Sequence, residues 1–276
     1  MDRTTAGNFY SDFCEKHQYN SIEYKGRVWK YIASGDSLEK TLVLLHGGGM
    51  DAGMWAYQIN ELESRYKIIA PSFELLPDSF RLRSEALNYI LTEEKAEHVI
   101  LCGHSYGGLL AQYFISFFPE NVEKIILAHT FYPTKGFIKR IKDKKLNTLK
   151  YIPEFVIKLA FKKRMKHCRV SRYNEFRNAY LNGFYSKINH KLLIDFYMTL
   201  VERLKEELPD ISGWRGKALI INSKDDHDTI DKFQELVAVY PEAETCIFES
   251  GAHHTPMLFP EEFTEAIKAF VTSTWS

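Results

Sequence analysis

The chain contains seven mainly apolar runs, each about as long as a β-strand and separated from the next by segments of mixed polarity. They cover residues 28–32, 41–45, 67–73, 99–103, 124–128, 217–221 and 245–248. In most of them the apolar residues are consecutive instead of alternating with polar ones. This pattern is typical of strands that are covered on both faces, as in a parallel sheet.

Segments with helical spacing lie between several of these runs. Residues 79–94, 106–118, 231–240 and 260–275 have this character. The last begins with Pro260 followed by two glutamates, which favours a helix start, and carries an apolar stripe that includes Phe263, Ile267 and Phe270. Strand and helix in alternation predict an α/β fold with a doubly wound, mostly parallel sheet.

One long interval breaks the alternation. Residues 133–209 contain no convincing strand, whereas Leu192, Phe196, Leu200 and Leu204 recur at helical spacing. We expect a helical lid over the carboxyl ends of the strands, where open α/β sheets bind ligands. The predicted organisation is therefore an α/β core of residues 1–132 and 210–276, interrupted by a lid of residues 133–209.

Charge is distributed unevenly, although the 276 residues carry 36 basic and 36 acidic side chains and a net charge of zero. Residues 135–172 hold fourteen Lys or Arg against Asp143 and Glu154, a local excess of twelve. This basic part of the predicted lid suits an anionic ligand, an acidic membrane surface or an acidic partner, but a solvated helix face explains it equally. No nucleic-acid-binding motif accompanies it, so nucleic acid is not an expected partner.

Composition adds several expected absences. The first residues are polar and lack the apolar core of a signal peptide, and no stretch approaches the ~18 apolar residues of a membrane span. The four cysteines lack metal-ligand spacing. We expect a cytoplasmic protein without an integral membrane segment, cofactor or metal.

The strongest chemical signal is Gly103-His104-Ser105-Tyr106-Gly107-Gly108, which lies between an apolar strand and a predicted helix. Gly-x-Ser-x-Gly in this setting predicts a nucleophile elbow, a tight turn that exposes the serine hydroxyl at the sheet edge. The amino end of the following helix would direct partial positive charge toward the same place. Ser105 is the predicted nucleophile.

A serine nucleophile needs a base, and the base needs an acid to orient it, expected in the chain order serine, acid, histidine. Asp226 follows the strand at 217–221 and is the predicted acid; Asp225 is the next candidate and Asp228 a distant third. His254 follows the strand at 245–248 and is the predicted base, with His253 as the alternative.

The predicted oxyanion hole combines the Tyr106 amide with that of Gly48, or of Gly49, in the run His46-Gly47-Gly48-Gly49 after the strand at 41–45. The run lacks the spacing of a nucleotide-binding loop. Candidate contacts to substrate near these segments are His46, Gly49, His104 and Phe131.

The glycine run, the elbow, Asp226 and His254-Thr255-Pro256-Met257-Leu258 together resemble the α/β-hydrolase fold superfamily over roughly residues 25–272. The resemblance implies a sheet of about eight strands and a lid inserted after the sixth. Two departures, Pro71-Ser72-Phe73-Glu74 in place of a glycine-rich segment and a region one residue short between His254 and Pro260, are similar to the maspardin-type branch.

Because relatives that act on epoxides or haloalkanes place aspartate at the elbow, Ser105 favours acyl transfer to water. We expect a carboxylesterase-like hydrolase of a small-molecule acyl substrate. The alternatives are a carbon–carbon bond hydrolase or lactonase with the same triad, and a non-catalytic binding or adaptor protein on this fold.

Overall fold

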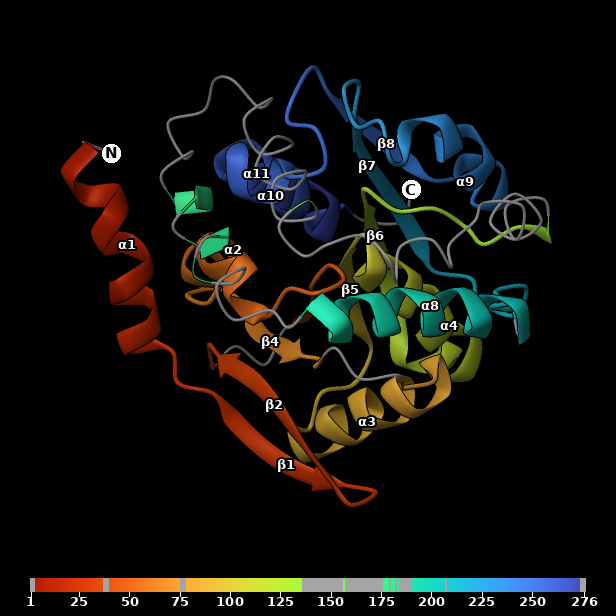
Figure 1. Cartoon of the computed structure of the whole chain (residues 1–276), viewed down its shortest axis with the longest axis horizontal. Helices are drawn as coiled ribbons and strands as arrows, with labels where there is room; N and C mark the ends of the chain where they lie inside the picture. The colour runs from red at the N-terminus through yellow and green to blue at the C-terminus, as the bar shows by residue number, and fades with distance from the viewer. Residues whose placement is uncertain are drawn as a thin grey trace.

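Eight strands form one mostly parallel sheet in the computed structural model of the chain (Figure 1). The structure describes residues 3–36, 40–74, 78–135, 156, 176–178, 180, 181, 183, 190–206 and 208–273. The order across the sheet is β1-β2-β4-β3-β5-β6-β7-β8, and only the pairs β1–β2 and β2–β4 are antiparallel. The strands are β1 (Asn20–Tyr24), β2 (Arg27–Ser34), β3 (Thr41–Leu45), β4 (Lys67–Ser72), β5 (Val99–His104), β6 (Val122–Ala128), β7 (Lys217–Ser223) and β8 (Glu244–Phe248).

Helices cover both faces of the sheet, which confirms the doubly wound α/β prediction. The α-helices are α1 (Arg3–Lys16), α2 (Ala56–Leu62), α3 (Phe80–Glu93), α4 (Tyr106–Phe117), α8 (His190–Glu206), α9 (Phe233–Val239), α10 (Thr255–Leu258) and α11 (Pro260–Thr272). One core cluster joins the sheet to α3, α4, α8 and α9, and a second joins it to α1, α2 and α11.

The residues of β3 show why most strands appear in the sequence as uninterrupted runs of apolar residues. Val43 and Leu45 belong to the first core cluster, whereas Leu42 and Leu44 belong to the second, and all four are fully buried. Successive side chains of a strand point to opposite faces, so a strand covered on both faces needs apolar residues at every position. The carboxyl ends of the parallel strands meet at one edge, where the candidate site lies.

All seven predicted strands are present, but the pattern missed the edge strand β1 and the helix α1. The residues of β1 are exposed or half-buried, because this strand pairs only with β2 and covers little of the core. The amino-terminal helix packs through aromatic side chains: Phe9 and Tyr10 contact Phe176, and Tyr10 also contacts Tyr180.

Most of the predicted lid, including the basic residues Lys162, Lys163, Arg164 and Lys166, lies outside the described residues. Within that interval the structure describes α8, which follows β6 and precedes β7 in the chain. Phe196 of α8 packs against Tyr106, with ring centroids 5.0 Å apart. No helix among the residues described above is both long and apolar enough to cross a bilayer.

Candidate active site

Ser105 occupies a strained turn between β5 and α4, with φ 54° and ψ −114°. Neighbouring glycines make the turn possible because the backbone leaves no room for a side chain. A Cβ on Gly103 would lie 2.4 Å from the carbonyl oxygen of Gly107, and one on Gly107 would lie 2.1 Å from that of Leu45. The Gly-x-Ser-x-Gly pattern therefore marks close backbone contacts that lift the Ser105 hydroxyl out of the sheet.

The histidine that contacts Ser105 is His253. Its Nε2 lies 2.9 Å from Ser105 Oγ, and its Nδ1 lies 2.9 Å from Asp226 Oδ2. The prediction of His254 as the base is thus corrected by one residue. His254 instead closes the turn before α10: its amide donates to the Gly251 carbonyl, and its own carbonyl accepts from the amides of Met257 and Leu258.

The loop before His253 is held by the side chain that ends β7, Ser223, and by that of Asp225 just after it. Ser223 Oγ donates to the Ala252 carbonyl at 2.7 Å, and Asp225 Oδ1 accepts from the Ala252 amide at 2.8 Å. These bonds fix Ala252 at φ 45° and direct the next side chain toward Ser105. Asp225, the second candidate for the acid, therefore binds the backbone of the histidine loop instead of the imidazole.

Asp226 is buried, and both of its carboxylate oxygens accept hydrogen bonds. Its Oδ2 accepts from His253, from His129 Nδ1 at 2.8 Å and from Thr229 Oγ1 at 2.5 Å, while Oδ1 accepts from the Asp228 amide at 3.0 Å. Burial raises the pKa of a carboxyl group, but the bonds from His129 and His253 outweigh it and hold the pKa of Asp226 below its usual range. Asp226 is therefore a stable anion beside His253.

The predicted oxyanion donors adjoin each other. Tyr106 is the first residue of α4, so its amide has no partner within the helix. A Cβ on Gly48 would lie only 3.5 Å from Tyr106 Cβ, which places the glycine loop against the start of the helix. Gly49 lies in the same turn with φ 75°. The contact brings together the two backbone segments from which the donors were expected.

His46 and His104, considered above as substrate contacts, are both buried and serve the protein backbone. The Phe73 amide donates to His46 Nε2 at 2.8 Å, so the ring proton is on Nδ1, which donates to the Gly47 carbonyl at 2.8 Å. His104 Nε2 donates to the His253 carbonyl at 2.8 Å. Both residues hold the loops of the site, and their contact with substrate stays a prediction.

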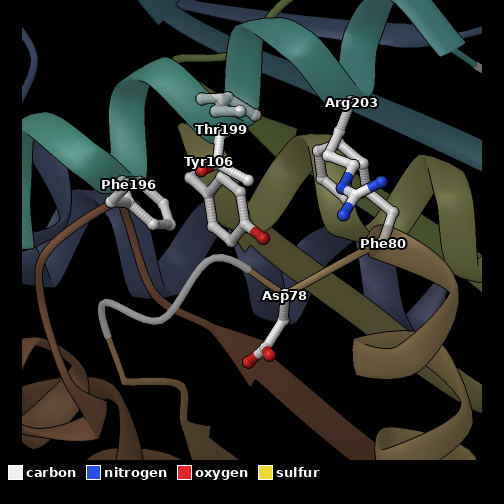
Figure 2. A pocket seen from close by; sticks show the side chains of 7 residues that line it. Asp78, Phe80, Tyr106, Phe196, Thr199 and Arg203 are labelled. Atoms are coloured by element: carbon white, nitrogen blue, oxygen red, sulfur yellow. The ribbon is translucent and has the colours of Figure 1, made fainter.

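A narrow cavity lies beside Tyr106, between α8 and the segment that begins α3 (Figure 2). Its lining comprises Asp78, Phe80, Tyr106, Phe196, Thr199, Leu200 and Arg203. Burial raises the pKa of the Tyr106 hydroxyl, and the Arg83 guanidinium lies 5.3 Å from the centre of its ring. Thus α8 covers Tyr106, the residue that follows Ser105. Phe131 is half-buried after β6, and its contact with substrate stays a prediction.

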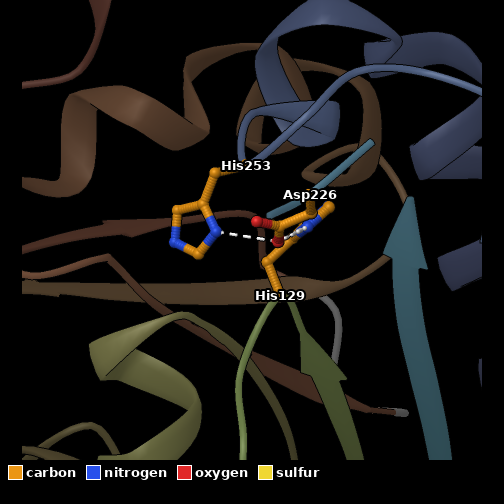
Figure 3. A group of neighbouring side chains, drawn as sticks. All are labelled: His129, Asp226 and His253. Carbon is orange, nitrogen blue, oxygen red and sulfur yellow. Dashed lines mark hydrogen bonds and ion pairs between the residues drawn. The ribbon is translucent and has the colours of Figure 1, made fainter. Parts of the chain in front are cut away.

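His129, which the sequence pattern did not single out, joins Asp226 and His253 in one cluster (Figure 3). Their possible metal-ligand atoms lie within 4.8 Å of one another. A carboxylate only accepts hydrogen bonds, so the Nδ1 atoms of both histidines carry protons directed at Asp226 Oδ2. A metal ion would have to displace both protons, and hydrogen bonding alone explains the cluster.

An eight-stranded sheet of this order, with a serine elbow at its carboxyl edge, is the architecture of the α/β hydrolases. A model of the alpha/beta hydrolase family matches residues 42–266, and the chain belongs to that family.

Two relatives that match parts of the chain are distant in sequence. Human epoxide hydrolase 4 is 25% identical over 170 residues, which are 55% of this chain and 47% of that protein. The pimeloyl-[acyl-carrier protein] methyl ester esterase of Pseudoalteromonas atlantica is 32% identical over 95 residues, 32% of this chain and 36% of the esterase. The matched stretch thus spans less than half the length of either relative.

Solved structures resemble the fold over nearly its whole length. The enol-lactonase from Burkholderia xenovorans superimposes with a TM-score of 0.71 at 17% identity, covering 92% of this chain and 100% of its own. A hydrolase from Pseudomonas aeruginosa gives a TM-score of 0.74 at 16% identity, covering 93% and 99%.

Proposed function

We propose that this protein is a serine hydrolase that cleaves a small carboxylic ester or a related acyl compound through Ser105, His253 and Asp226. The observation that carries the proposal is the chain of two 2.9 Å hydrogen bonds, from Ser105 Oγ to His253 Nε2 and from His253 Nδ1 to Asp226 Oδ2. This is the arrangement in which a histidine can remove the serine proton while an acid fixes its tautomer.

The proposed proton movements follow the hydrogen bonds of the three residues. Because Nδ1 of His253 donates to Asp226, its Nε2 has a free lone pair and accepts the Ser105 proton as Oγ attacks the acyl carbon. The imidazolium then protonates the leaving alcohol, which leaves an acyl group on Ser105. Water next attacks the acyl carbon and gives one proton to His253. The second tetrahedral intermediate then collapses, the acid is released, and Ser105 Oγ takes its proton back from His253 Nε2.

The amides of Tyr106 and Gly48 are the proposed donors to the oxyanion in both tetrahedral intermediates. Support for acyl chemistry comes from the serine at the elbow and from esterase and lactonase names among the relatives and structural neighbours. Nucleophile, base and donors all come from the chain itself, so the reaction needs no cofactor.

A fluorophosphonate probe tests the proposal directly, because it reacts with an activated serine. Wild type should be labelled and Ser105→Ala should not. His253→Ala should lower the labelling rate on the order of 1000-fold or more. The matched variant His254→Ala, one residue along the same loop, should stay within about tenfold of wild type, since its backbone bonds persist.

Hydrolysis of p-nitrophenyl esters of increasing chain length, alongside lactones and acyl thioesters, then defines the acyl group. An unlabelled wild type that hydrolyses none of these would favour the non-catalytic binding function. A His254→Ala defect larger than that of His253→Ala would return the base to His254.

A further inference from the structure

His129 connects the loops that carry the proposed acid and base. It lies directly after β6 and is fully buried, with φ 51°. Its Nδ1 is 2.8 Å from Asp226 Oδ2, and its Nε2 is 2.6 Å from Thr255 Oγ1 (Figure 3). Asp226 belongs to the loop after β7, and Thr255 begins α10, two residues after His253. One side chain from β6 therefore contacts both loops.

The two contacts define the protonation of His129. Nδ1 faces a carboxylate oxygen and must carry the proton. Burial lowers the pKa of the His129 imidazole, and this outweighs the opposing effect of its bond to Asp226. The ring is therefore neutral, so Nε2 accepts a hydrogen bond from the Thr255 hydroxyl. Thr255 thereby fixes the tautomer in which His129 donates to Asp226.

His129 and His253 donate to the same oxygen. Both Nδ1 atoms reach Asp226 Oδ2, at 2.8 and 2.9 Å, so the negative charge of one carboxylate is shared between two imidazoles. Two consequences follow from this shared acceptor. The Asp226 carboxylate cannot rotate without breaking its bond to one of the two imidazoles. The bond from His129 also reduces the attraction of Asp226 for the proton on His253.

We propose that His129 is a positioning residue of the triad, which fixes the Asp226 carboxylate against His253 and limits how tightly the Asp226–His253 pair binds a further proton. The proposal rests on the proposed function in that it assigns His253 as the base. It adds a residue that touches no substrate and acts through Asp226.

The direction of the effect on pH dependence follows from the charges around His253. The groups that face its imidazole are Asp226 and Asp228 from the loop after β7, His104 from β5, His129 from β6 and the adjacent His254. Loss of the His129 donor leaves the Asp226 charge less stabilised, so the Asp226–His253 pair takes up a proton at higher pH. The low-pH limb of the kcat/KM profile should move upward by about one pH unit.

Two substitutions separate hydrogen bonding from space filling. His129→Phe keeps a ring of similar size and removes the donor. His129→Asn places an amide N–H near the position of Nδ1, and Asn tolerates the positive φ. With a p-nitrophenyl ester, His129→Phe should lower kcat on the order of 10- to 100-fold with little change in KM, because the triad is misplaced while the substrate pocket is not. His129→Asn should restore kcat to within about threefold of the wild-type value. The low-pH limb of its kcat/KM profile should lie within about a few tenths of a pH unit of the wild-type limb.

The proposal is overturned if His129→Phe folds, as judged by its thermal melt, and keeps the wild-type kcat and pH profile. It is also overturned if His129→Asn is as impaired as His129→Phe, because the ring volume would then be what matters. Should His129→Phe fail to fold, Thr255→Val removes the hydroxyl that fixes the tautomer and should shift kcat and the pH limb in the same directions. A wild-type profile for Thr255→Val would then contradict the proposal.

Nuclear magnetic resonance keeps this test independent of turnover. The Nδ1 proton of His253 should change its resonance in His129→Phe and recover in His129→Asn, whether or not the protein hydrolyses any ester. An unlabelled wild type would refute the hydrolase function alone, whereas an unmoved His253 resonance would refute the positioning role of His129 alone.

Discussion

Buried neutral histidines should make this protein sensitive to mild acid. The size of the effect can be worked out for His46. This residue is 2% exposed, and both of its ring nitrogens are hydrogen-bonded to the backbone. Burial lowers its pKa to about 4. An unfolded histidine has a pKa near 6.5. Below about pH 6.5 His46 therefore binds a proton in the unfolded chain but stays neutral in the folded chain. The free energy of unfolding thus falls as the pH falls.

The size of the effect follows from the difference in pKa. Between pH 7 and pH 5 the loss of stability from His46 alone is about 2 kcal/mol, at about 1.4 kcal/mol for each pH unit below the unfolded pKa. Burial also lowers the pKa of His104 and of His129, which adds losses of the same sign. The free energy of unfolding of a natural domain is roughly 5–15 kcal/mol, so this change is a large fraction of it.

The buried carboxyl group of Asp226 acts in a lower pH range. The pKa of Asp226 lies below its unfolded value of 3.8, because the bonds from His129 and His253 outweigh the effect of burial. Its stabilising contribution is complete above that value and is lost only as the pH falls further. A change between pH 7 and pH 5 therefore reports on the histidines.

Urea unfolding at pH 7, 6 and 5, followed by the fluorescence of the buried Trp29, Trp55 and Trp214, measures the loss. We expect the free energy of unfolding to fall by at least about 2 kcal/mol. His46→Asn should reduce this pH dependence by about 2 kcal/mol. The control Ile126→Val, buried but without a titrating group, should lower stability by about 1 kcal/mol at each pH. Equal or greater stability at pH 5 than at pH 7 would refute the reasoning.

Two further predictions concern the acid and the elbow. Asp226→Asn should lower kcat/KM for an ester on the order of 10,000-fold, since the amide cannot hold the histidine tautomer, whereas Asp225→Asn, which loses only backbone contacts, should cost on the order of tenfold. The reverse order would make Asp225 the acid. Gly107→Ala should lower the free energy of unfolding by about 3 kcal/mol, because its Cβ meets Leu45, while the control Gly213→Ala, which has open space, should change it by less than about 0.5 kcal/mol. Equal effects of the two glycine substitutions would contradict the steric account.

The hydrophobic pattern predicted the interior of the sheet and the edge strand β8, but it missed the edge strand β1 at the other side. The run at 41–45 coincides with β3, since a strand buried on both faces must be apolar throughout. In β1, Asn20, Ser21 and Glu23 are exposed, so an edge strand with this composition cannot be told from a loop. The prediction thus depended on an apolar run, which β8 has at residues 246–248 and which β1 lacks.

The motif pattern likewise predicted the loop of the base but chose the wrong histidine. Adjacent His253 and His254 have the same chemistry, and the choice between them depends on how Ser223 and Asp225 hold Ala252. The sequence did contain one signal. The segment from His254 to Pro260 is one residue shorter than in the family pattern, whereas the segment from His253 to Pro260 has the length of that pattern. His129 left no such signal, because its contact with Asp226 joins residues 97 positions apart.

Backbone strain at the site explains why these contacts are needed. Ser105, His129 and Ala252 all have positive φ, at 54°, 51° and 45°, and each follows or faces the carboxyl end of a strand. Such residues cost on the order of 1 kcal/mol or more each and persist only where the surroundings fix them. The Ser105 amide donates to Ala128 and the His129 amide to Ile221, bonds that continue from one strand to the next. The sheet therefore holds in place the strained turns that direct Ser105, His253 and His129 toward one another, and this depends on strand register instead of local sequence.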